Sequence, residues 1–140
     1  MRQLIIANRV ISDDSDAYVI AEIGHNHQGS LKTAKELFQA AAECGVSAAK
    51  LQKRDNRGLY TREMFDKPYD NENSFGATYG EHREALEFGQ PEYEELQAES
   101  AKVGIAFFST AFDIRSADFL AALNRPAYKI ASGDLKNIPL

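Results

Sequence analysis

Short apolar runs that end in polar or ionisable residues recur along this chain, and a helix-like segment separates the first two long ones. Residues 18–23 form a nearly continuous apolar strand pattern, and residues 46–51 repeat it after a helical pattern over 30–44. Ser30 is a suitable N-cap for that helix, and Gly45 suits the position after its end. Strand, helix and strand in this order predict a βαβ unit with parallel strands.

The same alternation continues to the end of the sequence. The expected elements are a hairpin over 4–11, a helix from Pro91 to Gly104, a strand over 105–108, a helix from Asp113 or Ser116 to Leu123, a strand over 127–131 and the first turn of a helix at 137–140. Four β/α units after a short hairpin are typical of an α/β chain that forms half of a (β/α)8 barrel of the TIM type. We therefore expect residues 1–140 to be the amino-terminal half of one barrel domain.

Residues 53–90 interrupt this pattern and show no periodicity of either kind. Segments of this length inside a compact domain are usually functional or disordered. This one is rich in aromatic residues, which disordered segments lack. We expect a long ordered loop that covers a functional site or takes part in a subunit contact.

Composition narrows the class of protein. The 140 residues are 44% hydrophobic and 26% charged, as in globular domains, and the net charge of −5 without a Lys/Arg cluster argues against a nucleic-acid partner. No stretch has the length of a signal peptide or membrane span, so we expect a cytoplasmic protein without a membrane partner. The single cysteine, Cys44, excludes an internal disulfide, and we expect a buried packing thiol.

Ionisable residues occur at the carboxyl ends of the expected strands, where barrel enzymes carry their active sites. Glu22 ends one apolar strand, and Lys50 and Lys129 each lie inside another. Glu22 is either catalytic or the partner of a neighbouring lysine. The two lysines, with Thr110 and Ser132 nearby, could bind a phosphate or carboxylate, or one of them could form a Schiff base.

Three histidines are candidates for metal binding or hydrogen bonding. His25 and His27 form an H-x-H pair, which can chelate a metal, but two histidines without a third ligand are a weak signal. Hydrogen-bonding histidines are the default interpretation. His82 lies in the segment 53–90, and its role is open.

Several of these motifs, in this order along the chain, resemble the N-acetylneuraminate (sialic acid) synthase family, and most closely bacterial members that make sialic, legionaminic or pseudaminic acid. The resemblance covers nearly the whole chain from about Tyr18. The matching motifs are AEIG at 21–24 with NH at 26–27 and GS at 29–30, Lys50 with Gln52, FSTAFD at 108–113 and YKIASGD at 128–134.

The resemblance implies an enzyme that condenses phosphoenolpyruvate with an N-acetylmannosamine-type aldose to give a nine-carbon keto acid and phosphate. It also implies a divalent metal, typically manganese (Mn²⁺), and a homodimer when the protein is complete. Glu22 matches a catalytic carboxylate of the family. The positions that match substrate-binding residues are Lys50, Thr110, Lys129 and Ser132 for phosphoenolpyruvate, and Gln52 and Asp134 for the lining of the site.

Two positions depart from the family pattern: Ala111 replaces a common proline, and Asp134 replaces a common glutamate. The resemblance also implies that no metal ligand lies in this chain, with His25 excluded and His27 near the site only. The metal-binding histidines, further phosphoenolpyruvate contacts and an antifreeze-like domain would follow residue 140.

Two alternatives stay open. One is a related phosphoenolpyruvate-condensing synthase that makes a shorter keto sugar acid. The other is a half-barrel without catalysis that binds an anion or a partner subunit, since the open strand edges of half a barrel favour association.

Overall fold

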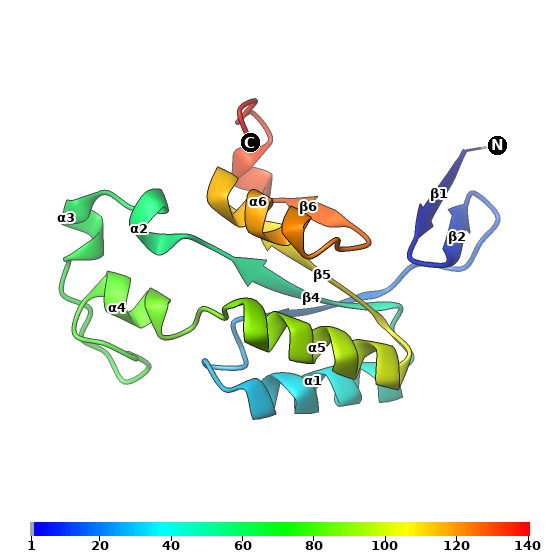
Figure 1. Ribbon diagram of the computed structural model, residues 1–140, viewed down its shortest axis with the longest axis horizontal. Helices are drawn as coiled ribbons and strands as arrows, with labels where there is room; N and C mark the ends of the chain where they lie inside the picture. Colours follow the sequence, from blue (N-terminus) through cyan, green and yellow to red (C-terminus); the bar gives the residue numbers. More distant parts are fainter. Residues whose placement is uncertain (1) are drawn as a thin grey trace.

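The computed structural model describes residues 2–140 and contains two sheets. Strands β1 (Gln3–Ile6) and β2 (Arg9–Ser12) form the predicted hairpin, which is antiparallel and places Leu4 opposite Ile11. The main sheet has the order β3-β4-β5-β6 and all its pairs are parallel (Figure 1). Its strands are β3 (Ile20–Gly24), β4 (Ala48–Lys53), β5 (Ala106–Ala111) and β6 (Tyr128–Ile130).

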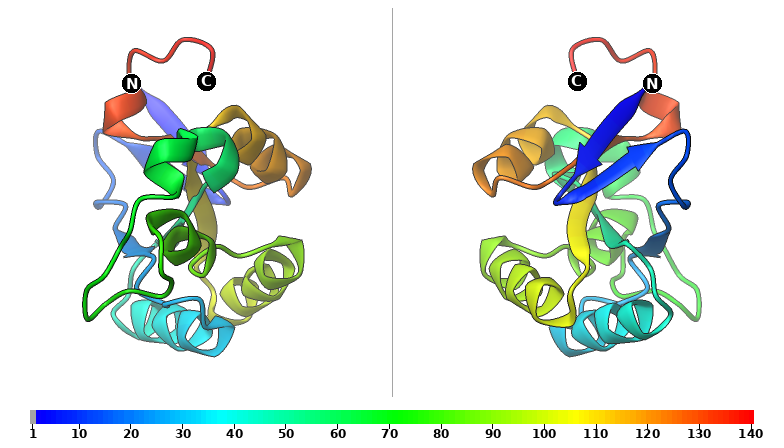
Figure 2. Two further views of the ribbon diagram at one scale, coloured as in Figure 1. Left: turned by 90° about the vertical axis from the view of Figure 1, so that its left-hand side faces the viewer. Right: turned by 90° about the vertical axis from the view of Figure 1, so that its right-hand side faces the viewer.

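Three longer helices connect these strands and cover one face of the sheet (Figure 2). They are α1 (Leu31–Glu43), α5 (Gln90–Val103) and α6 (Ile114–Ala122). Local signals set their ends. The Ser30 hydroxyl accepts a hydrogen bond from Thr33 N, the Asp113 carboxylate accepts one from Ser116 N, and α5 ends at Gly104, whose φ is 78°. The sequence left Asp113 and Ser116 open as the start of α6, and Asp113 is the cap.

Alternation along β4 and β5 separates the core from the candidate site. Ala49 and Leu51 belong to the buried core that the sheet shares with α1, α5 and α6. Lys50 lies between them and therefore faces the opposite side of the sheet, as does Thr110 next to the core residue Ala111. A parallel four-stranded sheet with helices on its outer side is a partial TIM-type barrel, as the sequence predicted.

Four expectations from the sequence differ from the structure. The strand at 18–23 was expected to be fully buried, but Ile20 and Glu22 are exposed because β3 is an edge of the sheet. Cys44 is exposed rather than buried, because it caps α1 beyond the residues that the helix packs inward. Residues 137–140 form turns and no helix, since a single turn does not offset the cost of helix nucleation.

The fourth difference concerns residues 53–90, which carry three short helices: α2 (Asn56–Leu59), α3 (Arg62–Phe65) and α4 (Tyr79–Glu84). Each has only four to six residues, too few for a visible periodicity. The segment lies beyond the carboxyl end of β4, on the side of the molecule away from the hairpin (Figure 1). It buries Phe65, Leu86 and Phe88. No helix among residues 2–140 has both the length and the apolar character needed to cross a membrane.

Candidate functional site

Glu22, Lys50 and Thr110 are in contact on the face of the sheet opposite the helices. Lys50 Nζ lies 2.6 Å from Glu22 Oε2 and donates a hydrogen bond of 2.9 Å to Thr110 Oγ1. The lysine side chain is only 4% exposed, whereas that of Glu22 is 55% exposed. Strand register accounts for the arrangement, because Glu22 lies opposite Lys50 in the β3–β4 pair. The three side chains form a buried cation held between an accessible carboxylate and a hydroxyl.

Opposing effects act on the pKa of Lys50. Burial lowers this pKa most strongly, and the positive charges of Lys129 and Arg54 lower it further. The hydrogen bond and the charge of Glu22 raise it but do not fully compensate. A buried ammonium with a lowered pKa and one accessible carboxylate partner can attract an anionic ligand.

Gln52 and Glu22 flank the bulge at which β3 ends. The register of β3 against β4 shifts between Glu22 and Gly24, and Gly24 has a φ of 56°, which favours glycine. A Cβ at Gly24 would lie 3.6 Å from Glu22 Oε1 and 3.8 Å from Gln52 Nε2. Both side chains therefore lie beside the same backbone position. Bulges of this kind redirect side chains next to active sites.

The remaining predicted site residues do not join this contact. Lys129 lies opposite Thr110 in the β5–β6 pair, but its side chain is exposed and donates only a long hydrogen bond of 3.4 Å to Ile130 O. Ser132 is exposed on the 3₁₀ helix η1 (Ser132–Asp134), and Asp134 is partly exposed there. Register brings Lys129 to the correct edge of the sheet. Of the four expected phosphoenolpyruvate-binding residues, Lys50 and Thr110 are in contact, whereas Lys129 and Ser132 are exposed and make no contact with them.

A second polar network lies at the same edge, around Glu87. His25 Nε2 is 3.4 Å from Glu87 Oε1, and Lys53 Nζ is 3.2 Å from Glu87 Oε2, which also accepts from Arg54 N at 3.2 Å. Burial acts to raise the pKa of Glu87, but His25, Lys53 and the Arg54 backbone N–H lower it overall. Glu87 stays ionised and anchors the end of segment 53–90 to β4. Neither Glu87 nor Arg54 was among the site residues that the sequence predicted, because no pattern along the chain assigns either of them a role.

His27 is held as a neutral, buried ring. It is 1% exposed, stacks on Phe88 at 4.1 Å, and its Nδ1 accepts a hydrogen bond from Gly29 N. Burial and the charge of His25 lower its pKa to about 4, against an opposing effect of Glu87. His82 is also buried, and its Nδ1 accepts from Phe75 N at 3.2 Å.

These surroundings do not fit a metal site. Nδ1 of His27 is already an acceptor, and Nε2 of His25 lies 3.5 Å from the Arg54 guanidinium, whose charge would repel a cation. In the described part of the chain, no three side chains of His, Cys, Asp or Glu are grouped so that they could hold a metal ion. Residues 2–140 therefore offer no such group of ligands for the expected Mn²⁺.

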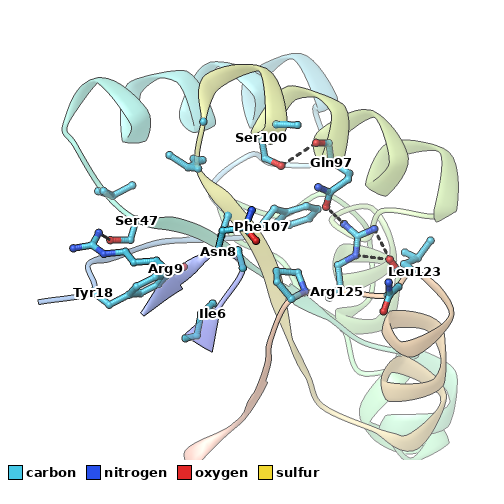
Figure 3. Close-up of a pocket in the computed structure, with 18 residues that line it drawn as sticks. Ile6, Asn8, Arg9, Tyr18, Ser47, Gln97, Ser100, Phe107, Leu123 and Arg125 are labelled. Carbon is cyan, nitrogen blue, oxygen red and sulfur yellow. Dashed lines mark hydrogen bonds between the residues drawn. The ribbon is translucent and has the colours of Figure 1, made fainter. Parts of the chain in front are cut away.

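A cavity of about 810 Å³ lies at the opposite, amino-terminal end of the sheet (Figure 3). Both of its arginines are already paired: Arg125 donates to Leu123 O and to Gln97 Oε1, and Arg9 donates to Ser47 Oγ. None of the predicted site residues lines it. The amino-terminal face of a barrel usually serves stability rather than catalysis.

A family model and individual relatives both assign the chain to one family. A family model described as the NeuB family matches residues 37–140. The chain is 43% identical over 138 residues to N-acetylneuraminate-9-phosphate synthase of Drosophila melanogaster, covering 97% of this chain and 37% of that protein. It is 37% identical to N,N'-diacetyllegionaminic acid synthase of Legionella pneumophila, covering 87% of this chain and 35% of that protein.

Solved structures agree with the sequence comparisons. The chain superposes with a TM-score of 0.79 on an N-acetylneuraminic acid (sialic acid) synthetase from Leptospira borgpetersenii in complex with citrate. The identity is 28%, and the match covers 99% of this chain and 44% of that chain. The chain thus spans a little over a third of the curated relatives quoted above and less than half of this solved structure.

Proposed function

The chain belongs to the NeuB family and is similar to N-acetylneuraminate-9-phosphate and legionaminic acid synthases, and we therefore propose that it forms part of a synthase. The proposed enzyme condenses phosphoenolpyruvate with an N-acetylated aldose. In this reaction C3 of phosphoenolpyruvate forms a bond to the aldehyde carbon, and the aldehyde oxygen becomes a hydroxyl. Water adds to C2, and the bond from C2 to the phosphate oxygen breaks, so the products are a keto sugar acid and inorganic phosphate.

The contact between Glu22, Lys50 and Thr110 supports this proposal most directly. Phosphoenolpyruvate carries a carboxylate and a phosphate, and a buried ammonium beside a hydroxyl suits either group. We assign Lys50 and Thr110 to phosphoenolpyruvate binding. Glu22 is accessible and within reach of a ligand on Lys50, so we assign it the role of the catalytic carboxylate that exchanges protons with the reacting atoms.

Gln52 and the residues near β6 complete the proposed substrate site. The Gln52 amide lies beside the Glu22 carboxylate at Gly24 and is suitably placed for hydrogen bonds to a sugar. Lys129 reaches the same edge through its register with Thr110, and Ser132 and Asp134 follow it in the chain. We propose that these three residues close the site once neighbouring parts of a complete barrel are present. Mn²⁺, the homodimer and the cytoplasmic location stay predictions.

The relatives fall into two groups whose names indicate different acceptor sugars. The Drosophila and human proteins, 43% and 41% identical to this chain, are named for a product phosphorylated at carbon 9. Phosphoenolpyruvate supplies three carbons, so carbon 9 of that product is carbon 6 of the aldose. The Legionella protein is named for legionaminic acid without such a phosphate. We propose an N-acetylated six-carbon aldose as the acceptor.

A Lys50→Met substitution in the complete protein tests the proposed function. Without Lys50, the anionic substrate loses its buried partner, so we expect kcat/KM for phosphoenolpyruvate to fall at least about 100-fold, or roughly 3 kcal/mol. Phosphate release and keto acid formation give the rates. Lys32→Met, which removes an exposed lysine of α1, is the matched control and should change them less than about twofold. Equal rates for the wild type and Lys50→Met would contradict the assignment.

A further inference from the structure

Two arginines at the carboxyl edge of the sheet have no carboxylate partner. Arg54 directly follows β4, and Arg83 lies on α4. Within residues 2–140, neither guanidinium lies within 4.0 Å of a carboxylate oxygen. Both arginines are half-buried. Two partly desolvated cations without a counter-ion are costly unless an anion from outside the chain compensates them.

Arg54 is held in place by contacts that do not include a direct ion pair, although the charge of Glu87 acts on it from a distance. Its guanidinium carbon lies 3.8 Å above the centre of the Phe112 ring, and its Nη1 is 3.5 Å from His25 Nε2. The neighbouring carboxylate, Glu87, is engaged by Lys53 and by His25 and meets Arg54 only at the backbone N–H. The stacking positions the guanidinium without using its donors.

Arg83 is positioned by a phenol instead of a carboxylate. Its Nε and Nη2 both donate to Tyr79 Oη, at 3.0 and 2.8 Å. The Tyr79 ring packs edge-to-face against Tyr60, with 5.2 Å between the ring centres, and Tyr60 follows α2. Burial lowers the pKa of Arg54 most strongly. The positive charge of Arg83 lowers this pKa further, whereas Tyr60 raises it. The charges of Arg54 and Arg83 also act on both phenols. Contacts along the chain agree with this placement, because Arg54 N bonds Glu87 and Arg57 pairs with Glu84, so residues 54–57 run beside residues 84–87. Arg54 therefore lies next to the group formed by Arg83, Tyr79 and Tyr60.

We propose that Arg54 and Arg83, with the phenols of Tyr60 and Tyr79, bind a phosphate carried by the acceptor sugar. This inference rests on the proposed function. Two guanidiniums and two hydroxyls are donors that suit a phosphate dianion. Arg54 lies four residue steps beyond Lys50 along the chain, a span of about 13 Å when the chain is extended. That span leaves room for phosphoenolpyruvate at Lys50 and a six-carbon chain whose far end reaches Arg54. The site would select the phosphorylated acceptor.

Kinetics with two acceptors test this site in the complete protein. N-acetylmannosamine 6-phosphate and N-acetylmannosamine differ only in the phosphate. Arg54→Gln and Arg83→Gln should each raise KM for the phosphorylated sugar at least tenfold. Arg83→Gln, whose charge does not act on Lys50, should leave KM for phosphoenolpyruvate and kcat/KM for the unphosphorylated sugar within about twofold. Arg54→Lys and Arg83→Lys should restore part of the loss, because they retain the charge. Arg62→Gln removes an exposed arginine of α3 and is the matched control.

The other possible results of these experiments distinguish a failure of the proposed phosphate site from a failure of the proposed synthase activity. Equal losses with both acceptors, or a wild type indifferent to the phosphate, would overturn the site while the synthase activity stands. If the wild type turns over neither sugar, the proposed function fails, and calorimetric titration with N-acetylmannosamine 6-phosphate decides about the site. Binding by the wild type that Arg83→Gln weakens at least tenfold supports the site. Absent or unchanged binding overturns it.

Discussion

At the scale of single residues, the environment rather than the residue type decides what the ionisable groups do. Lys50 and Lys129 have similar sequence surroundings, each inside an apolar strand. Lys50 lies on an inner strand of the sheet and is buried against Glu22 and Thr110, whereas Lys129 lies on the edge strand β6 and is exposed. His25 and His27 form a similar contrast, because His25 faces Glu87 and Arg54 while His27 stacks on Phe88.

His27 should make stability depend on pH. Its pKa is lowered from 6.5 to about 4 in the folded protein, so between these pH values the unfolded chain binds a proton that the folded one does not. The free energy of unfolding should therefore fall by about 3 kcal/mol as the pH drops from 6.5 to 4, and the full stability is present above pH 6.5. Guanidinium denaturation at several pH values measures this change.

The variant His27→Gln isolates the contribution of His27 from other titrating groups. The variant lacks the ionisable ring, so only the wild type loses stability through protonation of His27 as the pH falls. The unfolding free energy of the wild type should therefore approach that of the variant at low pH. Parallel curves for the two proteins from pH 7.5 to 4.5 would show that His27 does not titrate in this way.

At the scale of elements, close packing inside segment 53–90 joins α3 to α4. Gly80 on α4 lies against the Phe65 ring on α3, and an added Cβ would come within 2.3 Å of Phe65 Cγ. An ion pair joins α2 to α4, with Arg57 Nε of α2 at 2.9 Å from Glu84 Oε1 of α4. The segment thus packs through contacts among its own short helices.

Gly80→Ala should loosen this segment without unfolding the sheet. The clash with Phe65 forces α3 and α4 apart, at a cost of about 1–3 kcal/mol. Hydrogen exchange should then speed up over residues 62–84 and stay slow over 31–43. Gly133→Ala is the control, because a Cβ there meets no heavy atom within 4 Å. Unchanged exchange in Gly80→Ala would mean that the helices can separate at little cost.

At the scale of the whole molecule, both edges of the main sheet are open. β3 and β6 are its outer strands, and apolar side chains on them, including Ile20, Tyr128 and Ile130, are exposed. Unpaired edges with apolar side chains favour pairing with another chain. The 140 residues by themselves should therefore self-associate. With Lys129 and Ser132 facing solvent, they should show no turnover of phosphoenolpyruvate.

Sedimentation velocity over a range of concentrations measures the self-association. A charge at either edge, as in Ile20→Lys or Ile130→Lys, should shift the chain towards monomer. Leu135→Lys changes a residue that is 84% exposed and lies outside the strands, and it should have no such effect. A monomer at all concentrations, or the same shift with Leu135→Lys, would contradict the role of the edges.

The sequence by itself determined the order of the strands and of the three longer helices, the hairpin and most of the ends of those helices. Periodicity, caps and glycines are local signals, and Ser30, Asp113 and Gly104 act within a few residues of their own positions. It also placed Glu22, Lys50 and Thr110 at one edge, because parallel strands bring their carboxyl ends together.

Only the tertiary structure decided which of these groups touch. The bulge at Gly24, the network around Glu87 and the packing of Tyr60 against Tyr79 join residues from different elements. Burial was equally inaccessible to the sequence, as Cys44 and Ile20 show, because it depends on which strand is an edge and where a helix stops packing. These are properties of distances between elements, which no pattern along the chain records.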